Sequence, residues 1–253
     1  MTARRVTILG CGTSGGVPRA DGEWGVCDPA EPRNRRRRAS ILVQSERANI
    51  VVDTTPDLRE QCLDAGLQRI DAVFYTHTHA DHIMGLDDLR AFMLRQRHAI
   101  PIYCDEGSLE VLSQRFGYVF TGSLGYPAIC AANLIDGPQR VADMEVTSFE
   151  QIHGPLVSLG FRFGSVAYST DLNGLPEESK AALQDLDVWI VDALRYDPHP
   201  THAHLDLTLG WIEELRPRRA VLTHMTWDMD YRELSARLPS HVEPAYDGMV
   251  IDL

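Results

Sequence analysis

The chain has 253 residues, of which 44% are hydrophobic and 24% are charged, a composition typical of soluble globular proteins. This excludes a mainly disordered, collagen-like or coiled-coil chain. The 24 basic and 36 acidic residues give a formal net charge of −12, which disfavours binding to a nucleic acid polymer. No apolar run approaches the roughly 18 residues that a membrane span needs, and the N-terminal apolar run is too short for a secretory signal. The five cysteines form no CxxC pair, so we expect a reduced, cytoplasmic location.

Hydrophobic periodicity, glycine and proline define the expected elements. In the first half they predict, in order, a strand at Val6–Leu9, an irregular stretch at 11–39, a hairpin of Ile41–Val43 and Asn49–Val52, a helix at Pro56–Ala65, a strand at Ala72–Tyr75, a helix at Leu86–Arg97, a strand at Ile100–Cys104 and a helix at Leu109–Phe116. In the second half they predict strands at Ile129–Leu134, Glu145–Phe149, Val157–Phe163, Val166–Ser169 and Val188–Val191, a helix at Leu205–Leu215, a strand at Ala220–Thr223, a helix at Tyr231–Leu238 and a last strand at Val250–Leu253. This mixture predicts a layered α/β (α+β) architecture, most simply one domain over residues 1–253.

The segment HTHADH contains four potential metal ligands within six residues: His77, His79, Asp81 and His82. It follows a predicted buried strand, so these side chains are expected on the loop that the strand delivers. Imidazole and carboxylate groups suit Zn²⁺, Mn²⁺ or Fe²⁺. A loop of solvated histidines is the alternative, and the density of ligands argues against it.

Six residues cannot complete a site for two metal ions, so further ligands are expected at other strand ends. His153 follows the strand at Glu145–Phe149, Asp171 ends AYSTD, and His224 ends VLTH. Each is weak evidence alone, because a lone His or Asp at a strand end is often only a surface or capping residue. Together with the HxHxDH cluster they form a coherent set.

The order of HxHxDH, a lone His, a strand-ending Asp and a late TH resembles the metallo-β-lactamase superfamily. The resemblance covers essentially the whole chain and implies an αββα four-layer sandwich with metals at one edge of its two sheets. The superfamily's members hydrolyse lactams, thioesters, lactones, phosphodiesters and RNA, so the cluster does not select a reaction.

Three further segments, LGCGTSGGVPR, PRNRRRRAS and HAHLDLT, resemble the PhnP-like phosphodiesterases that act on phosphoribosyl 1,2-cyclic phosphate and are related to tRNA 3′-processing nucleases. The resemblance implies two divalent ions, Zn²⁺ or Mn²⁺, with Fe²⁺ also possible. It implies one metal held by His77, His79, His153 and Asp171, and the other held by Asp81, His82, Asp171 and His224, with Asp171 bridging. Asp53 matches a buried Asp that supports these ligands, and a simple strand-end cap is the alternative.

His204 matches, within HAHLDLT, a histidine that lies beside the scissile phosphate in this family. It is expected to stabilise the transition state or to give a proton to the leaving oxygen, and His202 is the rival assignment. Asp81 is expected to orient the nucleophile as well as to bind metal.

Several features of the early loop have other interpretations. The loop GCGTSG matches GxGxxG, but no helix is predicted after it, so dinucleotide binding is rejected. One arginine of the run Arg35–Arg38 could meet a substrate phosphate, and the sequence does not say which. Only Cys27 lies in the stretch where relatives carry extra cysteines, so no structural zinc is expected.

These observations together predict a metal-dependent phosphoric diester hydrolase of a small, nucleotide-like substrate. A ribosyl 1,2-cyclic phosphate or a 2′,3′-cyclic nucleotide is expected. The alternatives are a thioester or lactone hydrolase of the same fold, an RNA 3′-end nuclease, and a metal-binding protein without catalysis. The resemblance also makes a homodimer plausible.

Overall fold

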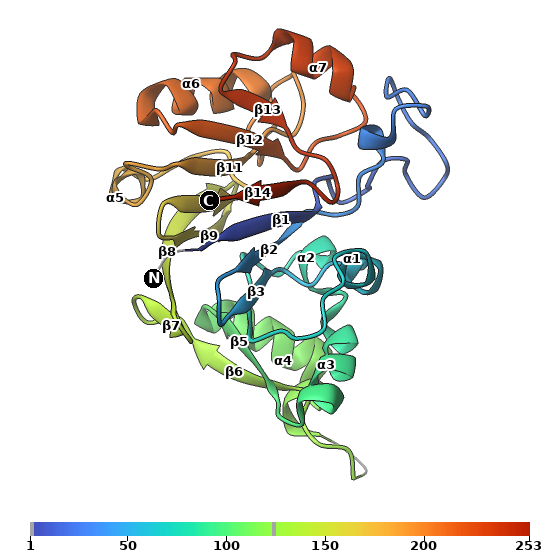
Figure 1. Cartoon of the computed structure of the whole chain (residues 1–253), viewed down its shortest axis with the longest axis vertical. Coiled ribbons are helices and arrows are strands. Elements are labelled where there is room, and N and C mark those ends of the chain that lie inside the picture. Colours follow the sequence, from blue (N-terminus) through green and yellow to red (C-terminus); the bar gives the residue numbers. More distant parts are fainter. Residues whose placement is uncertain (1–2, 123–124) are drawn as a thin grey trace.

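A computed structural model describes residues 3–122 and 125–253 of the chain, and its strands form two facing seven-stranded sheets within those residues (Figure 1). The first sheet has the order β14-β1-β2-β3-β4-β5-β6 and the second β13-β12-β11-β10-β9-β8-β7. The strands of the first sheet are β1 (Arg5–Gly10), β2 (Ser40–Gln44), β3 (Asn49–Val52), β4 (Ala72–Phe74), β5 (Ile100–Cys104), β6 (Cys130–Leu134) and β14 (Val250–Asp252). The strands of the second are β7 (Gln139–Val141), β8 (Met144–His153), β9 (Leu156–Phe163), β10 (Val166–Ser169), β11 (Val188–Asp192), β12 (Arg219–Thr223) and β13 (Val242–Pro244).

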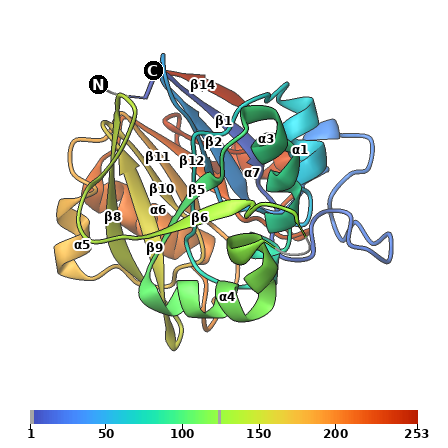
Figure 2. The ribbon, with the colours of Figure 1, turned by 90° about the horizontal axis from the view of Figure 1, so that it is seen from below.

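The helices cover the outer faces of the sheets (Figure 2). They are α1 (Leu58–Asp64), α2 (Ala80–Ile83), α3 (Leu89–Gln96), α4 (Glu106–Thr121), α5 (Glu177–Ala181), α6 (Leu205–Leu215) and α7 (Tyr231–Arg237), with 3₁₀ turns at Pro32–Asn34 and Leu86–Asp88. Apolar side chains of α1, α3 and α4 pack on the first sheet, and those of α6 and α7 belong to the core of the second. The expected αββα sandwich is therefore confirmed, and no helix in the described residues is long and apolar enough to cross a membrane.

Side chains point alternately to the two faces of each sheet, and apolar residues at successive positions therefore bury both faces. In β2, Ile41 and Val43 point into the core between the sheets, while Leu42 points toward the outer helices. Phe74 of β4 contacts Phe161 of β9 edge to face across the core, with the ring centroids 5.3 Å apart. The period of two that predicts a strand thus also assigns each side chain to a layer.

Apart from β8, which pairs antiparallel with β9, the strands that precede the candidate ligands lie in parallel pairs. Strands β3 to β6 are parallel in the first sheet, and β10 to β13 are parallel in the second. The carboxyl ends of parallel strands meet at one edge, so residues that follow them are brought together.

The sequence missed β7, β13 and α5, and it misjudged the ends of others. Strand β8 continues to His153 instead of ending at Phe149. Helix α4 begins at Glu106 because the Asp105 carboxylate caps it by accepting from the Ser108 amide at 2.8 Å. Asp81 and His82 lie in the short helix α2 and not on an open loop.

The early glycine-rich segment does not lead into a helix, as predicted, and the element that follows it is the 3₁₀ turn at Pro32–Asn34. Gly12 forms isolated β-bridges with Arg38 and with Met225. A Cβ added at Gly12 would lie 2.9 Å from the Arg36 Cβ, so a larger residue does not fit there. Glycine therefore allows the close approach of this loop to the backbone at Arg36 and Arg37.

Candidate metal centre

The predicted ligands gather at one edge of the sandwich from both sheets. His77 and His79 follow β4, His153 ends β8, Asp171 follows β10, and His224 follows β12. The first sheet and the second sheet therefore each contribute part of the cluster.

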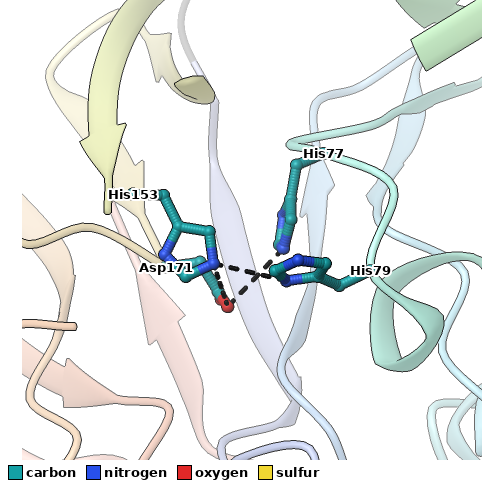
Figure 3. Close-up of side chains that lie close together, drawn as sticks. All are labelled: His77, His79, His153 and Asp171. Atoms are coloured by element: carbon teal, nitrogen blue, oxygen red, sulfur yellow. Dashed lines mark hydrogen bonds and ion pairs between the residues drawn. The ribbon is translucent and has the colours of Figure 1, made fainter. Parts of the chain in front are cut away.

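Four side chains form the first donor set, which Figure 3 shows converging on one point. Asp171 Oδ2 lies 3.6 Å from His77 Nε2 and 3.9 Å from His153 Nε2. His153 Nε2 lies 3.3 Å from His79 Nδ1. His153 is oriented from behind, because its Nδ1 donates to the backbone oxygen of Thr201 at 2.7 Å.

The second donor set shares the Asp171 carboxylate and uses its other oxygen. Asp171 Oδ1 lies 3.2 Å from His82 Nε2 and 3.4 Å from His224 Nε2. Asp81 Oδ2 lies 3.3 Å and 3.7 Å from the same two nitrogens. The structure thus places Asp171 between the two sets, as the resemblance implies for a bridging ligand.

The residues present fit divalent metal ions. Among the described residues, the buried Nε2 atoms of His77, His82 and His224 have no hydrogen-bond partner, although an unpaired buried polar atom is costly. Ligand nitrogens about 2.0–2.1 Å from a tetrahedral zinc lie about 3.4 Å apart, close to the spacings observed here. Two carboxylates among the imidazoles supply the negative charge that a divalent cation needs.

Protonation equilibria in the cluster follow from burial and charge. Burial alone would raise the pKa of Asp171, but His224, His82 and His77 hold it well below its usual value. Burial opposes the charged form of His224, yet Asp171, the Asp81 carboxylate and Asp192 raise its pKa to about 9. Burial and the neighbouring His82 hold the pKa of His77 well below its usual value, so its ring stays neutral. The acids are therefore ionised at neutral pH, and the cluster attracts cations, either protons or metal.

Asp53 supports the cluster from behind and is more than a strand-end cap. It is fully buried, and its carboxylate accepts from His82 Nδ1 at 2.7 Å and from the Thr76 amide and hydroxyl at 2.9 and 2.8 Å. The bond to Nδ1 fixes the ring of His82 so that Nε2 faces the second donor set. Such partners orient metal-binding histidines.

Backbone conformation also distinguishes the site. Asp53, Asp171 and His224 each follow a strand with φ values of 65°, 53° and 58°, in the left-handed region that non-glycine residues rarely adopt. Strain of this kind persists where the surroundings impose it. Of these three strand-end residues, Asp171 and His224 belong to the donor sets, and Asp53 supports His82 from behind.

Of the two histidines considered for the role beside the phosphate, the structure brings His202 to the cluster, whereas His204 begins a helix. His204 is the N-cap of α6, and its side chain belongs to no donor group among the described residues. His202 instead stacks on His224 with ring centroids 4.8 Å apart, and its Nε2 lies 3.8 Å from Asp171 Oδ2. The two histidines are separated by one residue, so the motif alone could not distinguish the one that faces the cluster.

Asp192 is a site residue that the sequence analysis missed. It ends β11, is fully buried, and accepts from His202 Nδ1 at 2.9 Å. Its other oxygen, Oδ1, lies 4.0 Å from His224 Nδ1. The signal was present, because Asp192 ends the buried run VWIVD just as Asp171 ends AYSTD.

The side chains of the arginine run contact residues outside the two donor sets. Arg36 is buried and donates to the backbone oxygens of Thr226 and Met229 at 2.9 and 2.6 Å. The remaining arginines of the run pair with acids or cover an aromatic ring: Arg37 with Asp64, Arg38 with Asp57, and Arg35 over Trp24. Their contacts hold the early loop in place.

Comparison with known proteins agrees with this geometry. Residues 48–225 match the model of the beta-lactamase superfamily domain. A crystal structure of a diphosphatase from the PhnP family is 36% identical, with a TM-score of 0.91, and the match covers 98% of this chain and 97% of that one. The short form of human tRNase Z has a TM-score of 0.71 at 21% identity over 98% of both chains, which shows the shared fold alone.

Another relative is named for a different activity. The octanoyltransferase of Porphyromonas gingivalis is 32% identical over 252 residues, which are 97% of this chain but 51% of the relative. The chain therefore spans about half the length of that protein.

Proposed function

Because the chain belongs to the beta-lactamase superfamily and to its PhnP family of hydrolases, we propose that it is a metal-dependent phosphodiesterase. The observation that carries the proposal is the Asp171 carboxylate, whose two oxygens each face a histidine set, next to the Asp192–His202 pair. The proposed substrate is a small cyclic phosphodiester, either a ribosyl 1,2-cyclic phosphate or a 2′,3′-cyclic nucleotide. The 36% identical relative is a diphosphatase, which supports phosphoryl chemistry.

Two divalent ions, Zn²⁺ or Mn²⁺ with Fe²⁺ as a third choice, are proposed for the two donor sets. His77, His79, His153 and Asp171 would hold one ion, and Asp81, His82, Asp171 and His224 the other. When bound, such ions neutralise charge on the phosphoryl oxygens and acidify a water molecule.

Asp81 is placed to hold the attacking water. Burial alone would raise the pKa of Asp81, but His82 and His224 hold it well below its usual value, so the carboxylate is ionised. Only part of this carboxylate is needed as a ligand, and the other oxygen can accept a hydrogen bond that orients the water. Holding the water in line with the phosphorus lowers the entropic barrier to attack.

His202 is proposed to serve the leaving oxygen, in the role first expected of His204. A carboxylate oxygen accepts in the bond between Asp192 and His202, so the donor is a proton on His202 Nδ1. This leaves Nε2 directed at the cluster, where a second proton makes it a donor to the leaving oxygen. Asp192 then stabilises the charged ring, as a buried carboxylate does behind a catalytic histidine.

The net charge of the protein supports a small substrate. With a formal net charge of −12, the protein repels a long polyanion, whereas a small phosphodiester meets only the cationic centre. A small substrate is therefore proposed in preference to an RNA 3′ end.

The test uses metal-loaded protein and a panel of esters. Bis(p-nitrophenyl) phosphate, a ribosyl 1,2-cyclic phosphate and 2′,3′-cyclic nucleotides are assayed beside a lactone, in wild type and in Asp171→Ala. The proposal predicts phosphodiester turnover that Asp171→Ala abolishes, with the metal content of both proteins measured. Lactone turnover without phosphodiester turnover would contradict it.

Hydrolysis of an acyl thioester is the second candidate. It is favoured by the octanoyltransferase relative, whose matched half is 32% identical to almost the whole of this chain. An octanoyl thioester in the same panel distinguishes the two candidates, because the phosphodiesterase proposal predicts no turnover of it.

A further inference from the structure

The Asp171 carboxylate presents one oxygen to each donor set, although the torsion that turns an aspartate carboxylate about its own axis is intrinsically soft. Its Oδ2 lies 3.6 Å from His77 Nε2 and 3.9 Å from His153 Nε2 (Figure 3), and its Oδ1 lies 3.2 Å from His82 Nε2. Within the described residues, the Nε2 atoms of His77 and His82 form no hydrogen bond with it. The orientation of the carboxylate therefore has another cause.

Thr170 supplies the hydrogen bond that fixes this orientation. It stands between β10 and Asp171, and its hydroxyl donates to Asp171 Oδ1 at 2.7 Å. Both side chains are buried. A hydroxyl that donates to a carboxylate forms a charge-assisted bond, roughly twice as strong as a bond between neutral groups. Because threonine is branched at Cβ, its side chain has few rotamers and holds the hydroxyl in a defined place.

Two more buried side chains hold the backbone on either side of this bond. Ser158 Oγ of β9 donates to the Asp171 backbone oxygen at 2.7 Å. Gln151 Nε2 of β8 donates to the Thr170 backbone oxygen at 3.0 Å and to Ser158 Oγ at 3.1 Å. Since Ser158 Oγ accepts from Gln151, its own hydrogen is left for Asp171. The bonds span three neighbouring strands and hold Asp171 at its φ of 53°.

Gly160 of β9 leaves the space that Gln151 needs. It pairs with Phe149 of β8 in the register of the two strands. A Cβ added at Gly160 would lie 2.2 Å from the Phe149 ring and 2.7 Å from Gln151 Oε1. A larger residue would therefore displace the amide that supports Thr170 and Ser158.

Thr223 is the natural comparison for Thr170. It ends β12 directly before His224, just as Thr170 stands directly before Asp171, and both threonines are fully buried. In the part of the chain that the structure describes, Thr223 Oγ1 has no hydrogen-bond partner. The two threonines thus precede a metal-ligand candidate in the same way, but only the Thr170 hydroxyl donates to one.

We propose that Thr170 is a positioning residue, which holds the Asp171 carboxylate so that each oxygen serves one donor set and both ions can bind together. The inference rests on the proposed function for the two ions, whereas the orientation of the carboxylate is a property of the metal-depleted protein as well. Without the hydroxyl the carboxylate can turn, and Oδ1 leaves the second donor set. Loss of a partner that orients a metal ligand lowers metal affinity by about 10- to 100-fold.

The first experiment tests the orientation in crystal structures of metal-depleted protein. Wild type is compared with Thr170→Val, which keeps the shape without the donor, with Thr170→Ser, which keeps the donor, and with the matched control Thr223→Val. Asp171 Oδ1 is expected beside His82 Nε2 in all but Thr170→Val, where it should have turned away. An unchanged carboxylate in Thr170→Val, or the same displacement in Thr170→Ser or Thr223→Val, would overturn the proposal.

The second experiment follows Mn²⁺ binding to the same proteins by calorimetric titration and electron paramagnetic resonance. Two Mn²⁺ ions joined by a carboxylate couple magnetically, so their spectrum differs from that of isolated ions. The coupled spectrum is expected in wild type, Thr170→Ser and Thr223→Val. In Thr170→Val the weaker ion should bind about 10- to 100-fold less tightly, and the coupled spectrum should be lost at Mn²⁺ concentrations that saturate wild type. Equal affinity and coupling in Thr170→Val and wild type would refute the inference.

Further variants and outcomes separate this inference from the proposed function. Thr170→Ala also removes the hydroxyl and replaces Thr170→Val if circular dichroism shows that the valine variant is unfolded. Wild type that binds two Mn²⁺ ions but hydrolyses no phosphodiester would refute the proposed function, while the spectra of the variants still decide the role of Thr170. Wild type that binds fewer than two ions would refute the two-ion proposal and the expected effect on binding, and the crystal structures would then decide whether Thr170 orients Asp171.

Discussion

His202 and His204 show how finely function depends on position at the scale of one residue. His202 is held by Asp192 and faces the cluster, while His204 begins α6. We predict that His202→Ala lowers turnover of bis(p-nitrophenyl) phosphate by about 10²- to 10⁴-fold, because it removes a proton donor. His204→Ala, its matched control, should stay within about threefold of wild type. The reverse order of the two effects would show that the first expectation from the motif was right.

Asp53 offers a second prediction at this scale. Its carboxylate orients His82 and is already satisfied by Thr76, so it acts on metal binding through the histidine. Asp53→Ala is expected to weaken metal affinity by about 10- to 100-fold. Competition with a chromophoric chelator measures this, and circular dichroism checks that the variant is folded. Unchanged affinity in a folded variant would assign Asp53 to the fold alone.

The site residues that the sequence could predict are metal-binding types that seldom occur so close together in a chain. HxHxDH, His153, Asp171 and His224 were placed together correctly, because four ligands in six residues seldom occur together by chance. Asp192 ends a buried strand as Asp171 does, but it was missed because a strand-end acid alone does not reveal its partner, His202. The choice between His202 and His204 depends on the path of one loop, which the residue types do not encode.

At the scale of elements, the early loop is attached through one acid from the turn before β14. Asp247 accepts from the Arg37 amide at 2.8 Å and from the Cys11 amide at 3.2 Å, and burial raises its pKa to about 7. Since the unfolded carboxyl titrates near 3.9, the folded protein binds the extra proton between about pH 4 and 7. The free energy of unfolding should therefore fall as pH rises through this window.

Asp247→Asn should remove that pH dependence and leave one amide unpaired, lowering the free energy of unfolding by about 1–3 kcal/mol. Urea titrations at pH 4.5 and 7.5 measure both effects. Asp252→Asn is the control, because Asp252 pairs with Arg5 in an exposed ion pair. An identical pH slope in Asp247→Asn and wild type would contradict the assignment.

Elements with a clear period were predicted well, and those fixed by tertiary contacts were not. The β2–β3 hairpin and α6 agree with the expected ranges because apolar alternation and a helical stripe are strong local signals. Strands β7 and β13 have three residues each, too few to show a period. Helix α2 has four residues, and its place after β4 depends on the cluster it serves.

At the scale of the whole molecule, the donor sets join the two sheets. His77, His79, Asp81 and His82 come from the first sheet's side, whereas His153, Asp171 and His224 come from the second. A metal ion held by ligands from both sheets binds only the folded state. At a free metal concentration a thousandfold above Kd, this binding stabilises the folded state by about 4 kcal/mol. Removing metal with a chelator should lower Tm by about 10 °C, and adding Zn²⁺ or Mn²⁺ should restore it. An unchanged Tm would mean that the cluster binds no metal tightly.

The most direct test of the account is the relative turnover of a phosphodiester and an octanoyl thioester by one metal-loaded preparation. A metal-dependent phosphodiesterase predicts hydrolysis of bis(p-nitrophenyl) phosphate that requires metal and is lost in Asp171→Ala, with no turnover of the thioester. Metal-dependent turnover of the thioester, with the phosphodiester intact, would contradict the account and assign the same centre to acyl chemistry.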